Sequence, residues 1–202
     1  MKRYFFHIES SACSGCKTCV VACKDLHDHD TGINLRQVIP VETGSWSIDK
    51  SIITGQPSAY YLSVSCHHCA DPACVAGCPT EALSVKENGI VVIDAGVCMG
   101  CGYCSWVCPY DAPKLDKNSG KTVKCDLCIS RLTEGLNPVC VDACPLRSIH
   151  IITEEEGSWK AESSDFYPLA DPSITKPSLI VTPHHSAVPG KREKNSKKNS
   201  DE

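Results

Sequence analysis

The sequence has 202 residues and a formal net charge of -4, with 42% hydrophobic and 6% aromatic residues. This length suits one or two small domains with a buried core, and the acidic balance together with the shortage of aromatic stacking platforms argues against a nucleic-acid partner. Apolar runs such as Ile90–Ile93 fall far short of the roughly 18 to 20 residues that cross a bilayer, so no transmembrane helix is expected.

The N-terminal residues predict the first strand of the fold. The apolar stretch is short and runs directly into Glu9 and Cys13, with no small-residue cleavage site. Residues 4–9 are therefore expected to form a strand instead of a secretory signal, and any export would be directed by a partner. A second outer strand is predicted over residues 148–152, which would pair the two ends of the chain.

Cysteine is the most unusual component, with sixteen residues in the chain. A content of about 8% borders on that of disulfide scaffolds, but those are usually short secreted chains with a signal peptide. Metal binding by thiolates is the better interpretation. The cysteines form four groups of four, namely Cys13-x2-Cys16-x2-Cys19-x3-Cys23, Cys66-x2-Cys69-x4-Cys74-x3-Cys78, Cys98-x2-Cys101-x2-Cys104-x3-Cys108 and Cys125-x2-Cys128-x11-Cys140-x3-Cys144.

The residue after each group indicates where the chain turns. Proline follows the last cysteine of the second, third and fourth groups, and it would stop a local helix there. Lys24 follows Cys23 instead. The chain is therefore expected to continue after the first group into a longer helix or insertion through residues 24–27.

Two hairpins are predicted between the cysteine groups. Residues 82–86 and 90–94 read as strands around the turn pair Asn88-Gly89, and a second hairpin spans residues 113–123. The cysteine-free segment before the second group is expected to cover one module and to end in a strand over residues 59–64.

These elements predict an α+β fold of two pseudo-symmetric bacterial-type ferredoxin modules with short hairpins. The polar, basic C-terminal tail is expected to be disordered, with contact to an acidic partner or a lipid surface as the alternative. The expected division is a discontinuous module of residues 1–23 and 109–160, an insertion of residues 24–65, a contiguous module of residues 66–108, an extension of residues 161–188 and the tail of residues 189–202.

The cysteine spacing predicts four 4Fe-4S clusters. A compact C-x2-C-x2-C loop places three thiolates around one cubane, while the fourth cysteine of the group ligates a neighbouring cluster. The spacing alone also allows the fourth cysteine of a group to be exchanged with other groups than those given next. Exchange within each module gives four sets that use every cysteine as an iron ligand: Cys13, Cys16, Cys19 with Cys144; Cys125, Cys128, Cys140 with Cys23; Cys66, Cys69, Cys74 with Cys108; and Cys98, Cys101, Cys104 with Cys78.

Zinc is the rival metal, because C-x2-C pairs are common zinc ligands. However, an uninterrupted C-x2-C-x2-C-x3-C run offers more thiols in one loop than a tetrahedral site can use. A thioredoxin-like redox pair would need a single C-x-x-C motif. No acid-base pair, nucleophile elbow or phosphate-binding loop is found, so no catalytic residue is predicted and the chain alone is not expected to be an enzyme.

Several other side chains lie beside the cysteines. His67 and His68 could be metal ligands, but the cubanes are already supplied with thiolates. Tyr103 and Trp106 are expected to shield a cluster from water. Positive charges near the ligands would favour the reduced state and raise the potential, although each could equally face the solvent. The candidates are Lys17, Lys24, Lys124, Arg131 and Arg147.

Five segments carry a resemblance to a known family over nearly the whole chain. They are Cys-Ser-Gly-Cys-Lys-Thr-Cys from Cys13, Tyr-Leu-Ser-Val-Ser-Cys-His-His-Cys from Tyr61, Asp-Pro-Ala-Cys from Asp71, Lys-Cys-Asp-Leu-Cys from Lys124 and Thr-Lys-Pro-Ser from Thr175. With these, the sequence resembles the iron-sulfur B subunit of the dimethyl sulfoxide reductase family of molybdopterin oxidoreductases. The cysteine pattern is shared by wider relatives, and the segments from Tyr61 and Thr175 favour this branch.

The resemblance implies an electron-transfer subunit in anaerobic respiration. It would relay single electrons between a quinol-linked integral membrane anchor subunit and a molybdopterin-containing catalytic subunit in a heteromeric complex. Family members of this kind lack an export signal and travel with a twin-arginine-tagged partner. The expected location is therefore peripheral to the cytoplasmic membrane through partner subunits, on the extracytoplasmic side.

Two further points concern relatives. Nitrate reductase-like proteins carry Trp at one ligand position and hold a 3Fe-4S centre, and the matching residue here is Cys101, so four complete clusters are expected. The alternative to a function in a dimethyl sulfoxide reductase-like complex is that of the equivalent subunit of a polysulfide, thiosulfate or tetrathionate reductase, a formate dehydrogenase or a hydrogenase.

Overall fold

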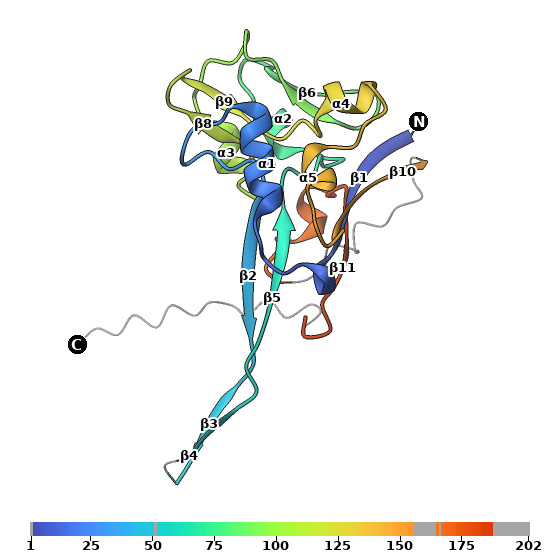
Figure 1. Cartoon of the computed structure of the whole chain (residues 1–202). Helices are drawn as coiled ribbons and strands as arrows, with labels where there is room; N and C mark the ends of the chain where they lie inside the picture. The colour runs from blue at the N-terminus through green and yellow to red at the C-terminus, as the bar shows by residue number, and fades with distance from the viewer. Residues whose placement is uncertain (1, 51, 156–164, 166, 188–202) are drawn as a thin grey trace, which may run out of the picture.

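The computed structural model describes residues 2–50, 52–155, 165 and 167–187 (Figure 1). The tail of residues 189–202, predicted to be disordered, lies outside the described residues. Among the residues described, no helix has both the length and the apolar character that crossing a bilayer requires.

A three-stranded sheet joins the two ends of the described chain. Its central strand β1 (Lys2–Glu9) pairs antiparallel with β10 (Ile149–Glu155) and parallel with β11 (Leu179–Thr182). Phe5 and Ile8 of β1 are completely buried. The predicted pairing of the outer strands is confirmed, and β11 is an addition that the sequence did not indicate.

Two short hairpins form where they were predicted. β6 (Leu83–Val85) pairs with β7 (Val91–Ile93), and β8 (Lys114–Asp116) pairs with β9 (Lys121–Val123), both antiparallel. The turn of the first hairpin contains Gly89 at a φ of +77°, a conformation that glycine adopts without steric cost.

The helices are short, and proline explains where most of them stop. They are α1 (Thr18–His27), α2 (Ala73–Ala76), α3 (Tyr103–Val107), α4 (Ile129–Thr133) and α5 (Val139–Asp142), with 3-10 turns at Ser10–Ala12 and Pro172–Ile174. Only α1 runs on past the last cysteine of its group, as expected from Lys24 in place of proline. An α-helix interior needs backbone N–H donors, which proline cannot supply.

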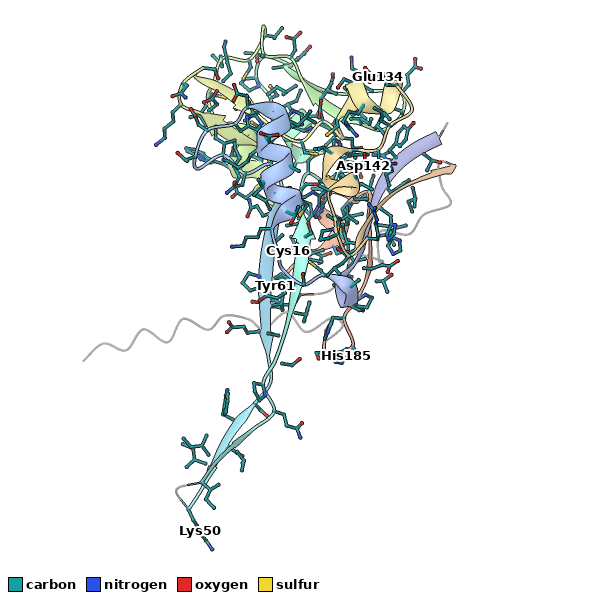
Figure 2. All side chains as sticks on the ribbon, viewed as in Figure 1. Cys16, Lys50, Tyr61, Glu134, Asp142 and His185 are labelled. Carbon is teal, nitrogen blue, oxygen red and sulfur yellow. The ribbon has the colours of Figure 1, made fainter. Side chains whose placement is uncertain are left out.

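The insertion is a long two-part hairpin. β2 (Gln37–Thr43) pairs with β5 (Ser58–Val64), and beyond them β3 (Trp46–Asp49) pairs with β4 (Ile52–Gly55). The inner pair lies against the body, whereas the outer pair projects away from it (Figures 1 and 2). The expectation that the whole segment covers one module is therefore wrong for β3 and β4.

The outer hairpin displays apolar side chains to the surroundings. Trp46, Ile48 and Ile53 are 68%, 76% and 67% exposed, and Lys50 lies at the turn (Figure 2). Trp46 packs over Gly55 of the opposite strand, where a Cβ would come within 2.4 Å of the indole.

Candidate iron-sulfur centres

The first set of cysteines, called set A, surrounds one cavity. Cys13, Cys16, Cys19 and Cys144 line a cavity with about 290 Å³ of empty space, part of it open to the solvent. Cys144 comes from the other end of the chain, and its Sγ accepts a hydrogen bond from the Ser148 backbone N–H at 3.3 Å. N–H donors of this kind are what a thiolate ligand requires.

Backbone in the left-handed region curves the set A loop. Gly15 has a φ of +75° and Lys17 a φ of +62°, just before α1 begins. The Tyr61 ring lies against Gly15, so that a Cβ there would come within 2.7 Å of it. Figure 2 shows Cys16 near Tyr61, at the point where β2 and β5 leave the body.

Two more sets line cavities of similar size in the region of α2, α3 and the short hairpins. Set C lines a cavity with about 350 Å³ of empty space and set D one with about 280 Å³, in both cases partly open to the solvent. The members of set C are Cys66, Cys69, Cys74 and Cys108, and those of set D are Cys78, Cys98, Cys101 and Cys104. The fourth cysteine of each group thus lies with the other group, as in the exchange that the spacing suggested.

The loop of set D gives a matched pair of glycine substitutions. Gly100→Ala is expected to destabilise the protein by about 3 kcal/mol or more, because a left-handed φ is combined with a collision. The φ of Gly100 is +75°, and its Cβ would lie 1.9 Å from the Gly120 carbonyl oxygen. Gly102 has a φ of +72° with nothing within 4 Å, so Gly102→Ala should cost only the strain, about 1–2 kcal/mol. Thermal unfolding midpoints of both variants check this, and equal losses would contradict the close approach.

Set B brings the first and fourth groups together. Cys23 of α1 lies close enough to Cys125, Cys128 and Cys140 for their charges to interact. Leu127 and Cys128 both have a positive φ, which turns the chain sharply ahead of α4. The structure therefore brings Cys23 of the first group near three thiols of the fourth group, and which thiols ligate the same cluster stays a prediction.

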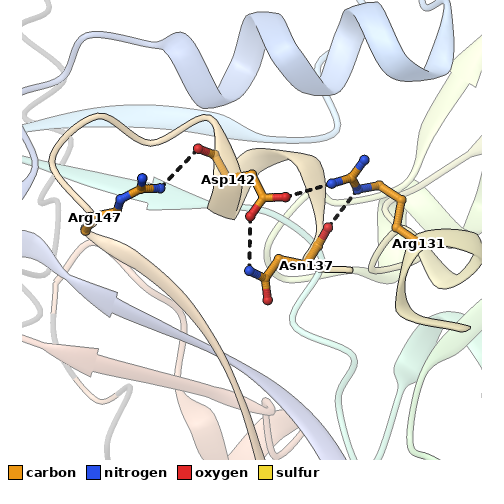
Figure 3. A network of polar contacts seen from close by, with 4 residues as sticks. All are labelled: Arg131, Asn137, Asp142 and Arg147. Atoms are coloured by element: carbon orange, nitrogen blue, oxygen red, sulfur yellow. Dashed lines mark hydrogen bonds and ion pairs between the residues drawn. The ribbon is translucent and has the colours of Figure 1, made fainter. Parts of the chain in front are cut away.

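A polar network closes the eleven-residue spacer between Cys128 and Cys140 (Figure 3). Arg131 donates from Nη2 to Asp142 Oδ2 at 2.7 Å and from Nε to the Asn137 carbonyl at 2.7 Å. Asn137 Nδ2 donates to Asp142 Oδ1 at 3.0 Å, and Arg147 donates to the Asp142 carbonyl at 3.2 Å. The network joins α4 to α5, so Cys128 and Cys140 both lie in set B despite the eleven residues between them.

Neighbouring sets approach one another in a single order. Cys19 of set A lies near Cys140 of set B, Cys125 of set B near Cys66 of set C, and Cys74 of set C near Cys104 of set D, each close enough for charges to interact. Cys16 of set A and Cys101 of set D are exposed. The sets thus form a row A, B, C, D with one exposed thiol in each end set.

Without a bound cation, the interior cysteines lose their protons only with difficulty. Burial raises the pKa of Cys23, Cys69, Cys74 and Cys128 to about 12 each. Sixteen thiols grouped in this way would repel one another as thiolates, whereas iron compensates their charge. The donor set, four soft sulfurs around each centre, fits a 4Fe-4S cluster.

His67 supports the presence of a group in the cavity of set C. Its ring lines that cavity and lies 4.0 Å from the Tyr110 ring, centroid to centroid. Burial, followed by the charge of Arg36, lowers the pKa of His67 to about 3, and neither ring nitrogen has a hydrogen-bond partner among the described residues. A buried neutral imidazole N–H needs an acceptor, which a thiolate or the sulfur of a bound cluster in this cavity would provide. His68, by contrast, accepts at Nδ1 from the Val91 N–H at 3.0 Å.

The predicted nearby cations fall into two kinds. Lys124 is buried and donates to the Cys125 carbonyl at 2.7 Å and to the Val91 carbonyl, between sets B and C. Lys24 donates to the Ile33 carbonyl at 2.9 Å and holds the start of the insertion. The exposed members are Lys17 and Arg147, and Arg131 is half-buried in the polar network.

Exposure bears on two aromatic predictions. Trp106 is 84% exposed and does not shield a thiol set as expected, whereas Tyr103 is 46% exposed with its ring against Gly77, next to Cys78 of set D, so its shielding role stays a prediction. Both lie on α3, whose five residues present one buried thiol, Cys104, and leave the rest of the turn at the surface.

Sequence reasoning missed Arg36, whose charged side chain is the most deeply buried among the residues that the structure describes. Arg36 is 1% exposed, in the cysteine-free segment just before β2. Burial alone would lower its pKa, but the charges of Cys140 and Cys125 raise it. No sequence signal marks this arginine, because the interior position depends on how the insertion packs against both halves of the body.

The fold and the four thiol sets define a ferredoxin-type iron-sulfur protein. Two family models described as 4Fe-4S dicluster domains match residues 57–154 and 12–83. The B subunit of an anaerobic dimethyl sulfoxide reductase of Haemophilus influenzae is 42% identical over 189 residues, which cover 93% of this chain and 92% of that protein. The protein belongs to the family of iron-sulfur B subunits of anaerobic dimethyl sulfoxide reductases.

Other relatives extend the comparison. A probable anaerobic dimethyl sulfoxide reductase chain of Escherichia coli, YnfG, is 42% identical over 188 residues, covering 93% of this chain and 92% of that protein. The iron-sulfur subunit of the nitrate-inducible formate dehydrogenase of Escherichia coli is 35% identical over 159 residues, covering 74% of this chain and 54% of that protein. These relatives are iron-sulfur subunits of oxidoreductases, and an electron-transport role fits that class.

Proposed function

We propose that the chain holds four 4Fe-4S clusters, one in each of sets A to D, with the sixteen cysteines as the iron ligands. Through them it relays single electrons between a quinol-linked membrane anchor and a molybdopterin catalytic subunit of a dimethyl sulfoxide reductase-like complex. The chain itself contributes no catalytic residue.

The single observation that carries this proposal is the row of thiol sets with exposed ends. Clusters bound there would supply one-electron transfer, and the protein supplies their binding, spacing and electrostatic surroundings. Cys16 and Cys101 place the two end sets at the surface, where partner subunits can approach, while no thiol of set B or set C is exposed.

The partners are proposed from the relatives. Relatives at about 40% identity over almost the full chain are subunits of dimethyl sulfoxide reductases, which favours a molybdopterin partner of that kind. The formate dehydrogenase subunit matches over a shorter part, which makes it the second candidate function. We place the complex at the cytoplasmic membrane through its anchor, on the extracytoplasmic side.

Metal analysis of the complex purified anaerobically from its host tests the proposal. The expected result is one iron atom per cysteine of this chain, after subtraction of the iron of its partners, together with acid-labile sulfide and molybdenum. Dimethyl sulfoxide and formate turnover by the same preparation then separates the two candidates. Nickel would indicate a hydrogenase instead, and zinc in place of iron would overturn the cluster proposal.

A further inference from the structure

Arg36 lies close to thiols of both set A and set B. Its Nη1 donates to Ser63 Oγ at 3.1 Å, and Ser63 Oγ lies 3.5 Å from Cys19 Sγ of set A. Since the guanidinium has only donors, the Ser63 hydroxyl hydrogen is free to point at the Cys19 sulfur. The charge of the guanidinium also acts on Cys140 of set B, so the two side chains lie close together.

The other contacts of this guanidinium are uncharged. Nη2 donates to Ser65 Oγ at 3.0 Å, and the guanidinium carbon lies 4.4 Å from the centre of the Phe6 ring. None of the ion pairs found in the described part of the chain includes Arg36. A buried arginine without a carboxylate is costly unless another anion compensates its charge.

An iron-sulfur cluster bound by each thiol set would provide that anion. Four thiolates outweigh the positive charge of a cubane core, so a bound cluster is a net anion, and one-electron reduction makes it more negative. A fixed cation in a site of low dielectric constant then favours the reduced form of each cluster near it. Arginine suits this role because it stays protonated at every physiological pH.

We propose that Arg36 is the shared counter-ion of sets A and B and raises the reduction potentials of both clusters together. Arg36 is a positioning residue for charge and does not ligate iron. The inference rests on the proposed function, since it requires clusters in both sets.

Redox titration of Arg36→Gln, followed by EPR of the complex purified anaerobically, tests the inference. The glutamine amide can keep hydrogen bonds to Ser63 and Ser65, so mainly the charge is removed. At a fixed applied potential, the reduced-to-oxidised ratio of two of the four clusters is expected to fall at least about tenfold, which for one electron corresponds to about 59 mV. The cluster of set D should titrate as in the unmodified protein, and that of set C, whose cavity His67 lines, should shift less than those of sets A and B.

Two further variants separate charge from structure. Arg36→Lys should restore the potentials of the two clusters, because it retains the buried charge. Lys50→Gln also removes one positive charge, at the exposed turn of the outer hairpin and away from the thiol sets (Figure 2), and should leave all four potentials in place.

The inference fails if Arg36→Gln leaves every potential unchanged, if all four clusters shift equally, or if Lys50→Gln shifts them as much. It also fails if Arg36→Gln and Arg36→Lys both lose iron, and to the same extent, which would indicate a structural role. An unmodified complex that lacks the iron and the EPR signals would instead disprove the cluster proposal itself.

Discussion

Removal of iron by an anaerobic chelator is expected to unfold the protein. The main core contains six of the buried thiols, Cys19, Cys23, Cys66, Cys125, Cys140 and Cys144, so emptying the sets removes the centre of the packing. Of the helices and sheets in the described part of the chain, four of the five helices have only four or five residues, and four of the five sheets have two strands. Helices and hairpins this small are not stable alone, and metal-binding energy of roughly 10–16 kcal/mol in small zinc domains equals or exceeds the usual stability of a whole domain.

Circular dichroism and limited proteolysis before and after chelation measure this effect. The loaded protein should give a near-ultraviolet signal and resist the protease, whereas the iron-free, fully reduced chain should lose both properties. Incubation with the chelator already saturated with iron is the matched control. A metal-free chain that still unfolds cooperatively near the midpoint of the loaded protein would contradict the expectation.

Cys140→Ser is expected to remove the cluster of set B and break the row between its two halves. Cys140 is 4% exposed, and a serine there loses the soft ligand and leaves a buried hydroxyl whose burial costs roughly 1–3 kcal/mol. Because set B is the neighbour that links set A to set C in the order found, set A should no longer exchange electrons with the others. Stopped-flow reduction through one end, with EPR of the clusters at the other end, measures the loss.

Cys16→Ser provides the matched control. It also changes one ligand to serine, but Cys16 is exposed in an end set, so solvent satisfies the new hydroxyl. Sets B, C and D should retain their clusters and exchange electrons with one another. Uninterrupted transfer from set A to set C in Cys140→Ser would contradict the serial arrangement.

The features that the sequence predicted depend on local spacing. The hairpin of β6 and β7 follows from the Asn88-Gly89 turn, and the extent of α1 follows from Lys24 in place of proline. The grouping of thiols follows from loops that can reach one cubane. Each of these depends on a few neighbouring residues, whose conformational preferences survive in the folded chain.

The features that could not be predicted arise from long-range packing. β11 is a four-residue strand that pairs with β1 across more than 170 residues of sequence, and nothing local marks its partner. The burial of Arg36 depends on the insertion meeting two distant cysteine groups. The exposure of Trp106 runs against its apolar character, because a five-residue helix buries only the side that carries Cys104.

The interleaving of the first and fourth cysteine groups has a consequence for biosynthesis. With the proposed ligand sets, the thiols of sets C and D are complete once Cys108 has been synthesised. Set A must wait for Cys144, and β1 gains its parallel neighbour only when residues 179–182 follow. Sets C and D can therefore receive iron on the nascent chain, whereas Cys13, Cys16 and Cys19 must be kept reduced until Cys144 has been synthesised.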